Sequence, residues 1–508
     1  MYKKAVLISS ANVIIDRAPA GLAFLAGICD HNQLDYEIFD LNIFLKKTYG
    51  DLLWQKIEVS SAFMKFNYPD EQFKSMIHEA ADQAASVVLK YNPDLIAITS
   101  LSHVQIAWTE KLLSAIRKRQ TITTIGGGPG ISFEQIIGKT AGRILADQGL
   151  LDYYVLGEGD YTFNDFLKGK IGEGVNSKED SVETWVPQLD NLNDIILPTY
   201  KKINFSDYGV HVSGFKIPPT INITGSRGCV RRCTFCDIGH LWKKFRFRSA
   251  DSIVAEILKS FYESGCTEYF FNDSLMNGSM KQFVEVMKQL IKHKQERPEL
   301  ESIRYSGQFI IRPQEQHPEY IFELMMQSGC NHIQVGLESG SEAVRTHMGK
   351  KFSNADVNYH LTMCDKYKIK NFINMIIAYP TETLEDFEET KNFYIENQKY
   401  LINEIIMGTN VSAPMGIYKN TPIHHMKNEL GIEIHNTEYF NSSNWTVATN
   451  PTLTVKERYR RYVELATLTT QLRYPKATDE LVFLEMNIED IRQEIRHRNK
   501  TILLKEEK

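Results

Sequence analysis

The sequence lacks any apolar run long enough to cross a bilayer, and it lacks a strong charge of either sign. Its 508 residues include 58 basic and 63 acidic side chains, a formal net charge of -5. A transmembrane helix needs roughly 20 consecutive apolar residues. The apolar run within the first ten residues is too short for a signal peptide and predicts a buried strand. We therefore expect a cytoplasmic protein without a membrane span, and its bulk charge does not favour a nucleic-acid partner.

Cysteine is also scarce, with seven in the whole chain. Four are scattered in or beside apolar helical patterns, which is typical of small buried hydrophobic residues; they are Cys29, Cys266, Cys330 and Cys364. A structural zinc site usually takes four ligands in two pairs, and no second pair stands at such a spacing. The scatter also argues against an additional, auxiliary metal cluster.

The other three cysteines are gathered in one short loop, Cys229-Val-Arg-Arg-Cys233-Thr-Phe-Cys236. Iron–sulfur clusters usually take four cysteines, so three thiolates can hold three irons of a 4Fe–4S cluster and leave the fourth iron open to a small molecule. His240 could in principle serve as a fourth ligand. A disulfide between such close neighbours is disfavoured in a chain without a secretory signal.

This loop resembles the signature loop of the radical S-adenosylmethionine (SAM) superfamily, in which the amino and carboxylate groups of SAM chelate the open iron. Phe235 and the run from Arg246 to Ser249 also resemble the superfamily, whereas Val230 stands where many relatives carry proline. The resemblance implies SAM as cofactor. It also implies a low-potential electron donor such as flavodoxin or ferredoxin.

The first third of the chain alternates short apolar runs with segments of helical period, which predicts a doubly wound parallel sheet. The predicted strands are 3–9, 36–40, 94–99 and 122–125. Ligands of such sheets bind at the carboxyl ends of the strands, where glycines cluster at 126–130 and 157–159. A tight turn or a nucleotide pocket would use the same glycines. No Gly-x-Gly-x-x-Gly follows the first strand, which counts against a dinucleotide site.

The order of these pieces over about residues 1–165 resembles the cobalamin-binding domain that is fused to many radical SAM enzymes. Alanine stands at position 18 where many cobalamin domains carry the histidine that ligates cobalt, so the resemblance implies binding without a histidine lower ligand. A solvated helix entry is the alternative for His103. The implied cobalamin contacts are Ala18, Gly21, Ser100, Ser102, His103, Gly126, Gly127, Gly128, Gly157, Glu158 and Gly159.

After a polar, glycine- and proline-broken stretch, six strand-like runs recur with helical segments between them. They are 220–224, 268–272, 303–308, 332–337, 372–378 and 404–411. The resemblance implies the partial (βα)6 barrel of the superfamily, with its chemistry at the strand carboxyl ends. We therefore divide the chain into a cobalamin-binding domain, a linker, a radical SAM barrel and a C-terminal helical region, at 1–168, 169–215, 216–425 and 426–508.

Polar residues follow these predicted barrel strands, and the resemblance implies that they contact SAM. The implied contacts are Asn272, Asp273 and Ser274, then Gln308 and Arg312, then Glu338 and Ser339. For Asp273 and Glu338 a helix cap is the structural alternative. The run 378–383 resembles a Gly-x-Pro-Gly-Glu-Thr element in which Ala378 and Thr381 replace glycines, so its backbone is expected to differ.

The last eighty residues predict helices at 455–472 and 479–498, the second with an apolar stripe. We expect this region to close the bottom of the barrel and to help select the substrate. Trp445 could belong to the core or to a substrate wall.

The resemblance implies a cobalamin-dependent radical SAM methyltransferase. A 5'-deoxyadenosyl radical made from SAM would take hydrogen from an unactivated carbon, and the substrate radical would collect a methyl group from methylcobalamin. A second SAM would then remethylate the cobalamin. The alternatives are a cyclisation or rearrangement on the same cofactors, and a non-catalytic cobalamin or SAM sensor. The substrate, a small molecule or a peptide, is not identified by the sequence.

Overall fold

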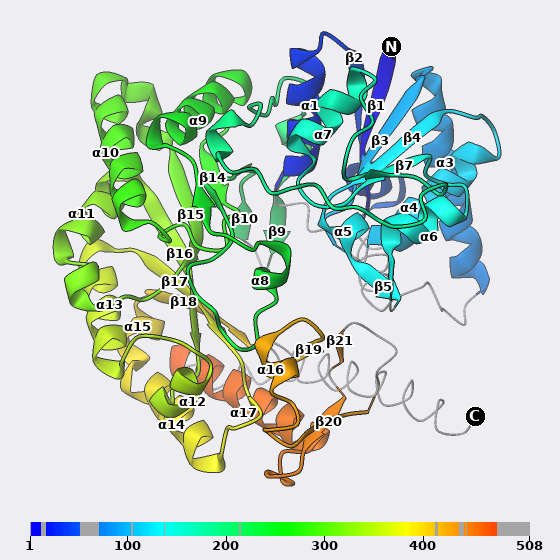
Figure 1. The fold of residues 1–508 in the computed structure, drawn as a ribbon. Coiled ribbons are helices and arrows are strands. Elements are labelled where there is room, and N and C mark those ends of the chain that lie inside the picture. Colours follow the sequence, from blue (N-terminus) through cyan, green and yellow to red (C-terminus); the bar gives the residue numbers. More distant parts are fainter. Residues whose placement is uncertain are drawn as a thin grey trace.

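The computed structural model describes residues 2–11, 17–50, 71–102, 105–136, 138–212, 215–411, 415–435, 441–442 and 444–474. Two α/β units lie side by side (Figure 1), the first formed by the N-terminal third and the second by residues beyond 220. His103 and the predicted helix 479–498 lie outside the described residues. Within the described ranges no helix is both long and apolar enough to span a bilayer.

The N-terminal unit is built on a six-stranded sheet in the order β2-β1-β3-β4-β7-β8, in which only β8 is antiparallel to its neighbour. The strands are β1 (Lys4–Ser9), β2 (Asp35–Asp40), β3 (Leu95–Thr99), β4 (Thr123–Gly127), β7 (Tyr153–Val155) and β8 (Val175–Asn176). The four strands that the sequence predicts here are confirmed. β5 (Glu134–Ile136) and β6 (Lys139–Thr140) form a separate hairpin.

Helices cover both faces of this sheet, as the near-continuous apolar strands require. Because side chains alternate along a strand, Leu7 packs with α1 (Ala20–His31) and α7 (Gly159–Leu167), whereas Ile8 packs with the helices of the other face. Those helices are α3 (Glu71–Lys90), α4 (Ile106–Arg117), α5 (Pro129–Ser132) and α6 (Ala141–Asp147). The predicted doubly wound sheet is confirmed.

The segment between the two units contacts both of them. Thr199 donates its backbone N–H to the Ala23 carbonyl of α1, 3.1 Å away, and the Tyr200 hydroxyl donates to the Asn222 carbonyl in the second unit at 3.2 Å. This segment contains the short helices η2 (Leu192–Asp194) and η3 (Phe205–Asp207) and the hairpin of β9 (Val210–Val212) and β10 (Phe215–Ile217). It therefore fixes one unit against the other along its length.

The second unit is a curved parallel sheet in the order β11-β14-β15-β16-β17-β18. Its strands are β11 (Thr220–Ile223), β14 (Glu268–Phe271), β15 (Arg304–Phe309), β16 (Cys330–Glu338), β17 (Lys370–Met375) and β18 (Ile406–Val411). The main covering helices are α9 (Ala250–Ser264), α10 (Met280–Glu296), α11 (Glu319–Ser328), α13 (Asn354–Tyr367) and α14 (Leu384–Glu396). The six predicted strands are confirmed.

The two faces of this barrel sheet differ in burial. Ile333 and Val335 are buried, whereas Gln334 between them is only half-buried. The N-terminal unit lies on the side opposite the outer helices (Figure 1), and its Arg17 guanidinium stands 4.1 Å from the ring centre of Phe270 on β14. The half-buried face of the barrel therefore looks toward the N-terminal unit.

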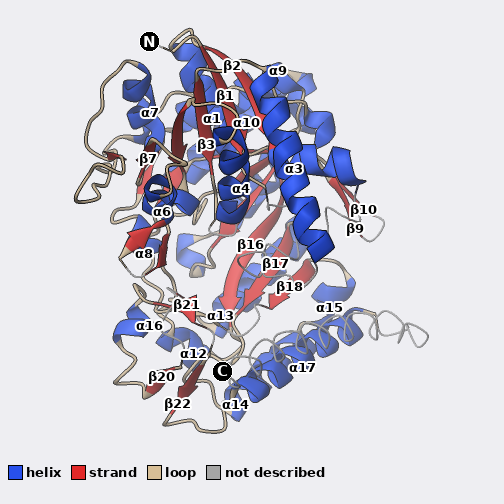
Figure 2. Cartoon of the chain, turned by 90° about the vertical axis from the view of Figure 1, so that its right-hand side faces the viewer, coloured by secondary structure: helices blue, strands red, loops and turns tan. Residues whose placement is uncertain are grey.

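The C-terminal part packs under the barrel (Figure 2), where α17 (Val455–Arg473) contacts α14 and α15 (Gln398–Ile402). The predicted helix 455–472 is confirmed. The region also holds short strands that the sequence did not predict, among them the pair β20 (Ile432–Ile434) and β22 (Trp445–Val447). Trp445 is a core residue, because it is buried and donates its indole N–H to the Met415 carbonyl at 2.8 Å.

Candidate active site

The cysteine loop leaves the carboxyl end of β11 and is closed at its base by two short strands. β12 (Ser226–Arg227) pairs antiparallel with β13 (Arg246–Phe247), so residues 228–245 form the loop, with the short helix α8 (Ile238–Leu241) inside it. Gly228 has φ +89°, and a Cβ there would lie 2.5 Å from the Lys244 carbonyl oxygen. Only glycine fits at this close approach. The three loop cysteines are half-buried and free.

The loop is braced by a turn from the far side of the barrel. The backbone N–H of Thr234 donates to the Met348 carbonyl at 3.0 Å, and the Thr234 hydroxyl pairs with the Tyr379 hydroxyl at 2.7 Å. Gly349 has φ +80°, and a Cβ there would be 3.2 Å from the Arg232 carbonyl oxygen. These contacts fix the middle of the cysteine loop.

Burial raises the pKa of all three thiols, that of Cys236 to about 11. In the described part of the chain, no three His, Cys, Asp or Glu side chains form the close group that holds a single metal ion. A four-iron cluster asks for something else, since each thiolate holds a different iron and the thiolates stand further apart. Three half-buried thiols on one glycine-shaped loop fit that group.

A lysine downstream of β16 lies beside these thiols. Lys350 donates to Glu338 Oε1 at 2.9 Å and to the Gly336 carbonyl at 3.0 Å, and its Nζ is 5.6 Å from the ring centre of Phe235. Its positive charge opposes the effect of burial on the pKa of Cys233. Cations near a cluster offset the negative charge of its thiolates, so Lys350 suits a site for an anionic cluster.

Two of the predicted SAM contacts brace the start of the cysteine loop. Asp273 is buried; its carboxylate accepts from the Gly225 backbone N–H and from the Ser226 hydroxyl, both at 2.7 Å. Burial raises its pKa to about 7, although these hydrogen bonds oppose the shift. Asn272 accepts from the Thr224 hydroxyl at 3.0 Å. Ser274 follows them and is half-buried. The end of β14 is therefore fastened to the end of β11.

The remaining predicted SAM contacts are spread over four places. Glu338, with φ +70°, joins the cysteine loop through Lys350. Gln308 hydrogen-bonds Gln334 on the half-buried face of the barrel. Arg312 donates to the Asn277 and Gly278 carbonyls at 2.9 and 3.0 Å, and the Ser339 hydroxyl pairs with Thr390 of α14 at 3.3 Å. Their contacts with SAM stay predictions.

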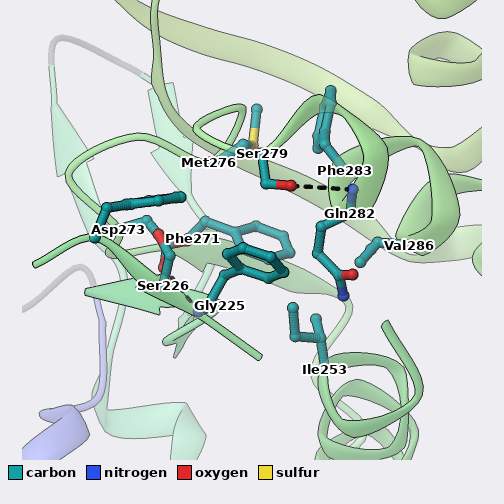
Figure 3. Close-up of a pocket in the computed structure, with 12 residues that line it drawn as sticks. Gly225, Ser226, Ile253, Phe271, Asp273, Met276, Ser279, Gln282, Phe283 and Val286 are labelled. Atoms are coloured by element: carbon teal, nitrogen blue, oxygen red, sulfur yellow. Dashed lines mark hydrogen bonds between the residues drawn. The ribbon is translucent and has the colours of Figure 1, made fainter. Parts of the chain in front are cut away.

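A small cavity lies behind the base of the loop, between α9 and α10 (Figure 3), and is lined by Asp273, Gln282 and Phe271 among others. Its volume of about 20 Å³ holds one water-sized molecule. The cavity is therefore too small for SAM.

The run that follows β17 keeps the backbone of a glycine although alanine occupies it. Ala378 has φ +59°, a left-handed conformation that costs an L-residue roughly 1–2 kcal/mol. Its N–H donates to Glu382 Oε1 at 3.0 Å, and Glu382 is paired with Arg461 of α17 at 2.8 Å. Ala378 therefore takes a left-handed conformation that favours glycine.

Several of the predicted cobalamin contacts lie at the carboxyl edge of the N-terminal sheet, where some leave the backbone open and others pack against neighbouring residues. Gly127 has no atom within 4 Å of the position of a Cβ, so its face of the edge is open. Gly128, with φ +95°, would place a Cβ 2.6 Å from the Ser100 carbonyl oxygen. The Ser100 hydroxyl turns inward to Thr109 of α4, 3.1 Å away. Gly21 packs closely against Thr99 in the same way, and Gly126 packs against Leu151.

A buried glutamine that the sequence analysis missed ties this edge together. Gln105 accepts from the Ser102 N–H at 3.2 Å and donates to the Ser10 carbonyl at 2.5 Å. The loops after β1 and β3 are therefore held in one shape. Ala18 lies at the seam between the units, where its N–H donates to the Thr220 carbonyl at 3.3 Å and its carbonyl accepts from Asn222 at 3.1 Å.

The acidic loop after β7 crosses to the cysteine loop. Gly157 takes φ +96° and Gly159 begins α7. Glu158, between them, accepts from Arg246 Nη1 at 3.1 Å and lies 3.2 Å from Arg227 Nη1. Its corrin contact stays a prediction, but its carboxylate already has partners in the barrel unit.

Comparison with known proteins agrees with this geometry. Residues 223–394 match the model of the radical SAM superfamily. A cytidylyl-2-hydroxyethylphosphonate methyltransferase of Streptomyces wedmorensis is 23% identical over 382 residues, which cover 68% of this chain and 65% of that protein.

Two solved structures share the fold across both units. The radical SAM methyltransferase TsrM of Kitasatospora setae, with cobalamin and a 4Fe–4S cluster bound, matches with a TM-score of 0.61 at 15% identity over 86% of this chain and 78% of that one. The cobalamin-dependent SAM radical enzyme OxsB, with aqua-cobalamin and SAM bound, matches with a TM-score of 0.63 at 18% identity over 91% and 66%. Residues 223–394 therefore form a radical SAM domain, and the chain shares the two-unit fold of TsrM and OxsB.

Proposed function

We propose that this chain is a cobalamin-dependent radical SAM methyltransferase that transfers a methyl group to an unactivated carbon of its substrate. The observation that carries the proposal is the direct attachment of the open-edged N-terminal sheet to the cysteine loop, through Glu158 and Arg227. When bound, the cluster and SAM supply a radical that removes hydrogen, and the corrinoid supplies the methyl group. The fold similarity to TsrM and OxsB supports the same set of cofactors.

The residues of the chain divide the work of holding these groups. Cys229, Cys233 and Cys236 hold the cluster, and Lys350 offsets its negative charge. The open backbone at Gly127 receives the corrinoid, and Ala18 at the seam offers no imidazole to cobalt.

The substrate lies between the two units, because the half-buried face of the barrel looks toward the N-terminal unit. Gln308 and Gln334 offer amide groups there, and Phe270 offers an aromatic ring beneath Arg17. These groups suit a substrate with polar atoms, held while the reacting carbon is shielded from water.

The exposed surface around the cysteine loop suits an acidic electron donor. Arg232, Lys243 and Lys244 are exposed, and Val230 and Phe247 add exposed apolar area. The whole chain carries a net charge of -5, so this local excess of positive charge is distinctive. A small acidic redox protein of the flavodoxin or ferredoxin kind would be steered to it.

Anaerobic reconstitution of the full chain with iron, sulfide and hydroxocobalamin tests the proposal. We expect about one bound corrinoid per chain, because the sheet offers one site at its carboxyl edge. With SAM and a strong reductant we expect 5'-deoxyadenosine together with S-adenosylhomocysteine. Cys233→Ala should lose the cluster absorbance and 5'-deoxyadenosine but keep the corrinoid. Cys266→Ala, which removes a buried thiol outside the loop, is the matched control and should keep all three.

Absence of a bound corrinoid in the reconstituted chain would contradict the proposal. With a substrate in hand, the product should gain one methylene in mass. A product of unchanged carbon count would indicate a rearrangement instead.

A further inference from the structure

The base of the cysteine loop is a pair of arginines that need negative partners. Arg227 and Arg246 stand directly opposite each other in the β12–β13 pair, and like charges directly opposite are destabilising. The ring of Trp242 lies 5.7 Å from each guanidinium carbon, which relieves this repulsion only in part.

Both carboxylates that neutralise these arginines come from the N-terminal unit. Asp160 accepts from Arg227 Nη1 and Nη2 at 2.7 and 2.9 Å, and Glu158 accepts from Arg246 through both of its oxygens. The four side chains are between 1% and 12% exposed. Glu158 stands at the N-cap position of α7, yet its side chain makes no capping bond. The Glu158 carboxylate instead pairs with Arg246 and Arg227.

Arg248, two residues after Arg246, differs from these two arginines in the origin of its carboxylate partner. Arg248 is fully buried, and its partner Glu256 belongs to α9 of the barrel itself. The barrel therefore neutralises Arg248 with its own residue, whereas Arg227 and Arg246 depend on the other unit. A buried charge left without its partner is strongly unfavourable, and Arg227 and Arg246 keep their carboxylate partners only while the N-terminal unit is docked.

The two loops that meet in this cluster each adjoin one of the two proposed cofactor sites. Glu158 follows β7 at the carboxyl edge of the N-terminal sheet, and Arg227 stands two residues before Cys229. We propose that Glu158 and Asp160 are positioning residues that couple corrinoid binding in the N-terminal unit to cluster binding in the barrel, a step that rests on the proposed function. Such coupling is reciprocal, so each group strengthens the binding of the other.

The coupling is measured on the full chain as the dissociation constant of hydroxocobalamin with and without the reconstituted cluster. In the wild-type chain the cluster should tighten corrinoid binding by about 5- to 150-fold. In Asp160→Asn and Glu158→Gln this factor should fall toward one. Asp160→Glu, which restores the carboxylate, should recover part of it.

Glu256→Gln is the matched control, because it removes an equally buried arginine partner inside the barrel. It should lower stability but leave the coupling factor unchanged. An equal factor in wild type and Asp160→Asn, or no coupling in the wild type, overturns the proposal.

Amide hydrogen exchange of residues 228–245 gives a second readout that needs no corrinoid. Protection there should fall in Asp160→Asn and should stay in Glu256→Gln. Unchanged protection in Asp160→Asn overturns the positioning role. A chain with normal coupling and protection that makes no methylated product would instead sink only the proposed function.

Discussion

The carboxylate of Asp160 accepts two hydrogen bonds from the guanidinium of Arg227, at 2.7 and 2.9 Å, across the seam between the two units. Bidentate pairs of this kind fix orientation as well as distance. Because Arg227 stands two residues before Cys229, the pair sets where the N-terminal sheet lies relative to the thiols.

Lys350 should set the reduction potential of the cluster. Lys350→Met removes a positive charge beside Cys233 and Cys236, and a more negative surrounding makes a cluster harder to reduce. We expect the midpoint potential, followed by electron paramagnetic resonance during a redox titration, to become more negative. Lys292→Met, at an exposed lysine of α10, should leave it unchanged. An unchanged potential in Lys350→Met would show that this lysine has no such effect.

The exposed lysines of the cysteine loop should govern reduction by a protein donor. Lys243→Glu with Lys244→Glu should slow reduction by flavodoxin hydroquinone at low salt by about 10-fold or more, because steering depends on local charge. Reduction by dithionite should not change. The control is the double variant Lys288→Glu with Lys292→Glu on α10, which reverses the same amount of charge away from the cysteine loop. Equal flavodoxin rates in the two double variants would place the docking surface elsewhere.

Asp273 should make stability fall with rising pH. Burial raises its pKa to about 7, above the value of about 3.9 in an unfolded chain. Between these values the folded chain binds more protons than the unfolded chain, so its stability decreases as pH rises from about 4 to about 7. Asp273→Asn cannot ionise and should lose this part of the dependence.

Thermal unfolding of the apo chain at pH 5 and pH 8 checks this sign. The midpoint temperature of Asp273→Asn should lie further below that of the wild type at pH 5 than at pH 8. A deficit that grows with pH would contradict the raised pKa.

Ala378→Gly should stabilise the barrel unit. The left-handed φ of +59° strains alanine but not glycine. A net gain of about 1 kcal/mol would raise the midpoint of thermal unfolding by about 2–4 °C for a unit of this size. Ala466→Gly, inside α17, should lower the midpoint, because glycine weakens a regular helix. A fall in both variants would mean that the turn at Ala378 carries no strain.

The strands were predictable because local pattern determines them. The run 332–337 is a short apolar stretch between polar segments, and it lies inside β16 (Cys330–Glu338). The spacing of the three loop cysteines was also recognisable, because it lies within a few residues of the sequence. Strands as short as β20 (Ile432–Ile434) leave too few residues for a period to be recognised.

Partners distant in the sequence were not predictable. A polar residue after a strand looks the same whether it meets a ligand, its own helix or another unit. Ser100 turns to Thr109, nine residues on, whereas Glu158 meets Arg246, 88 residues away. Lys350 donates a hydrogen bond to Glu338 because a turn brings the chain back to the end of β16. Such pairings follow from tertiary packing, which a single sequence does not display.

The most direct test of the central claim needs no substrate. The full chain, reconstituted with its cluster and with cob(I)alamin, is incubated anaerobically with SAM that carries a trideuterated methyl group, and the extracted corrinoid is analysed by mass spectrometry. We predict trideuteromethylcobalamin and S-adenosylhomocysteine in equal amounts, with 5'-deoxyadenosine appearing once a strong reductant is added. A corrinoid that stays unmethylated while SAM is cleaved to 5'-deoxyadenosine would contradict the methyltransferase and leave only a radical SAM enzyme.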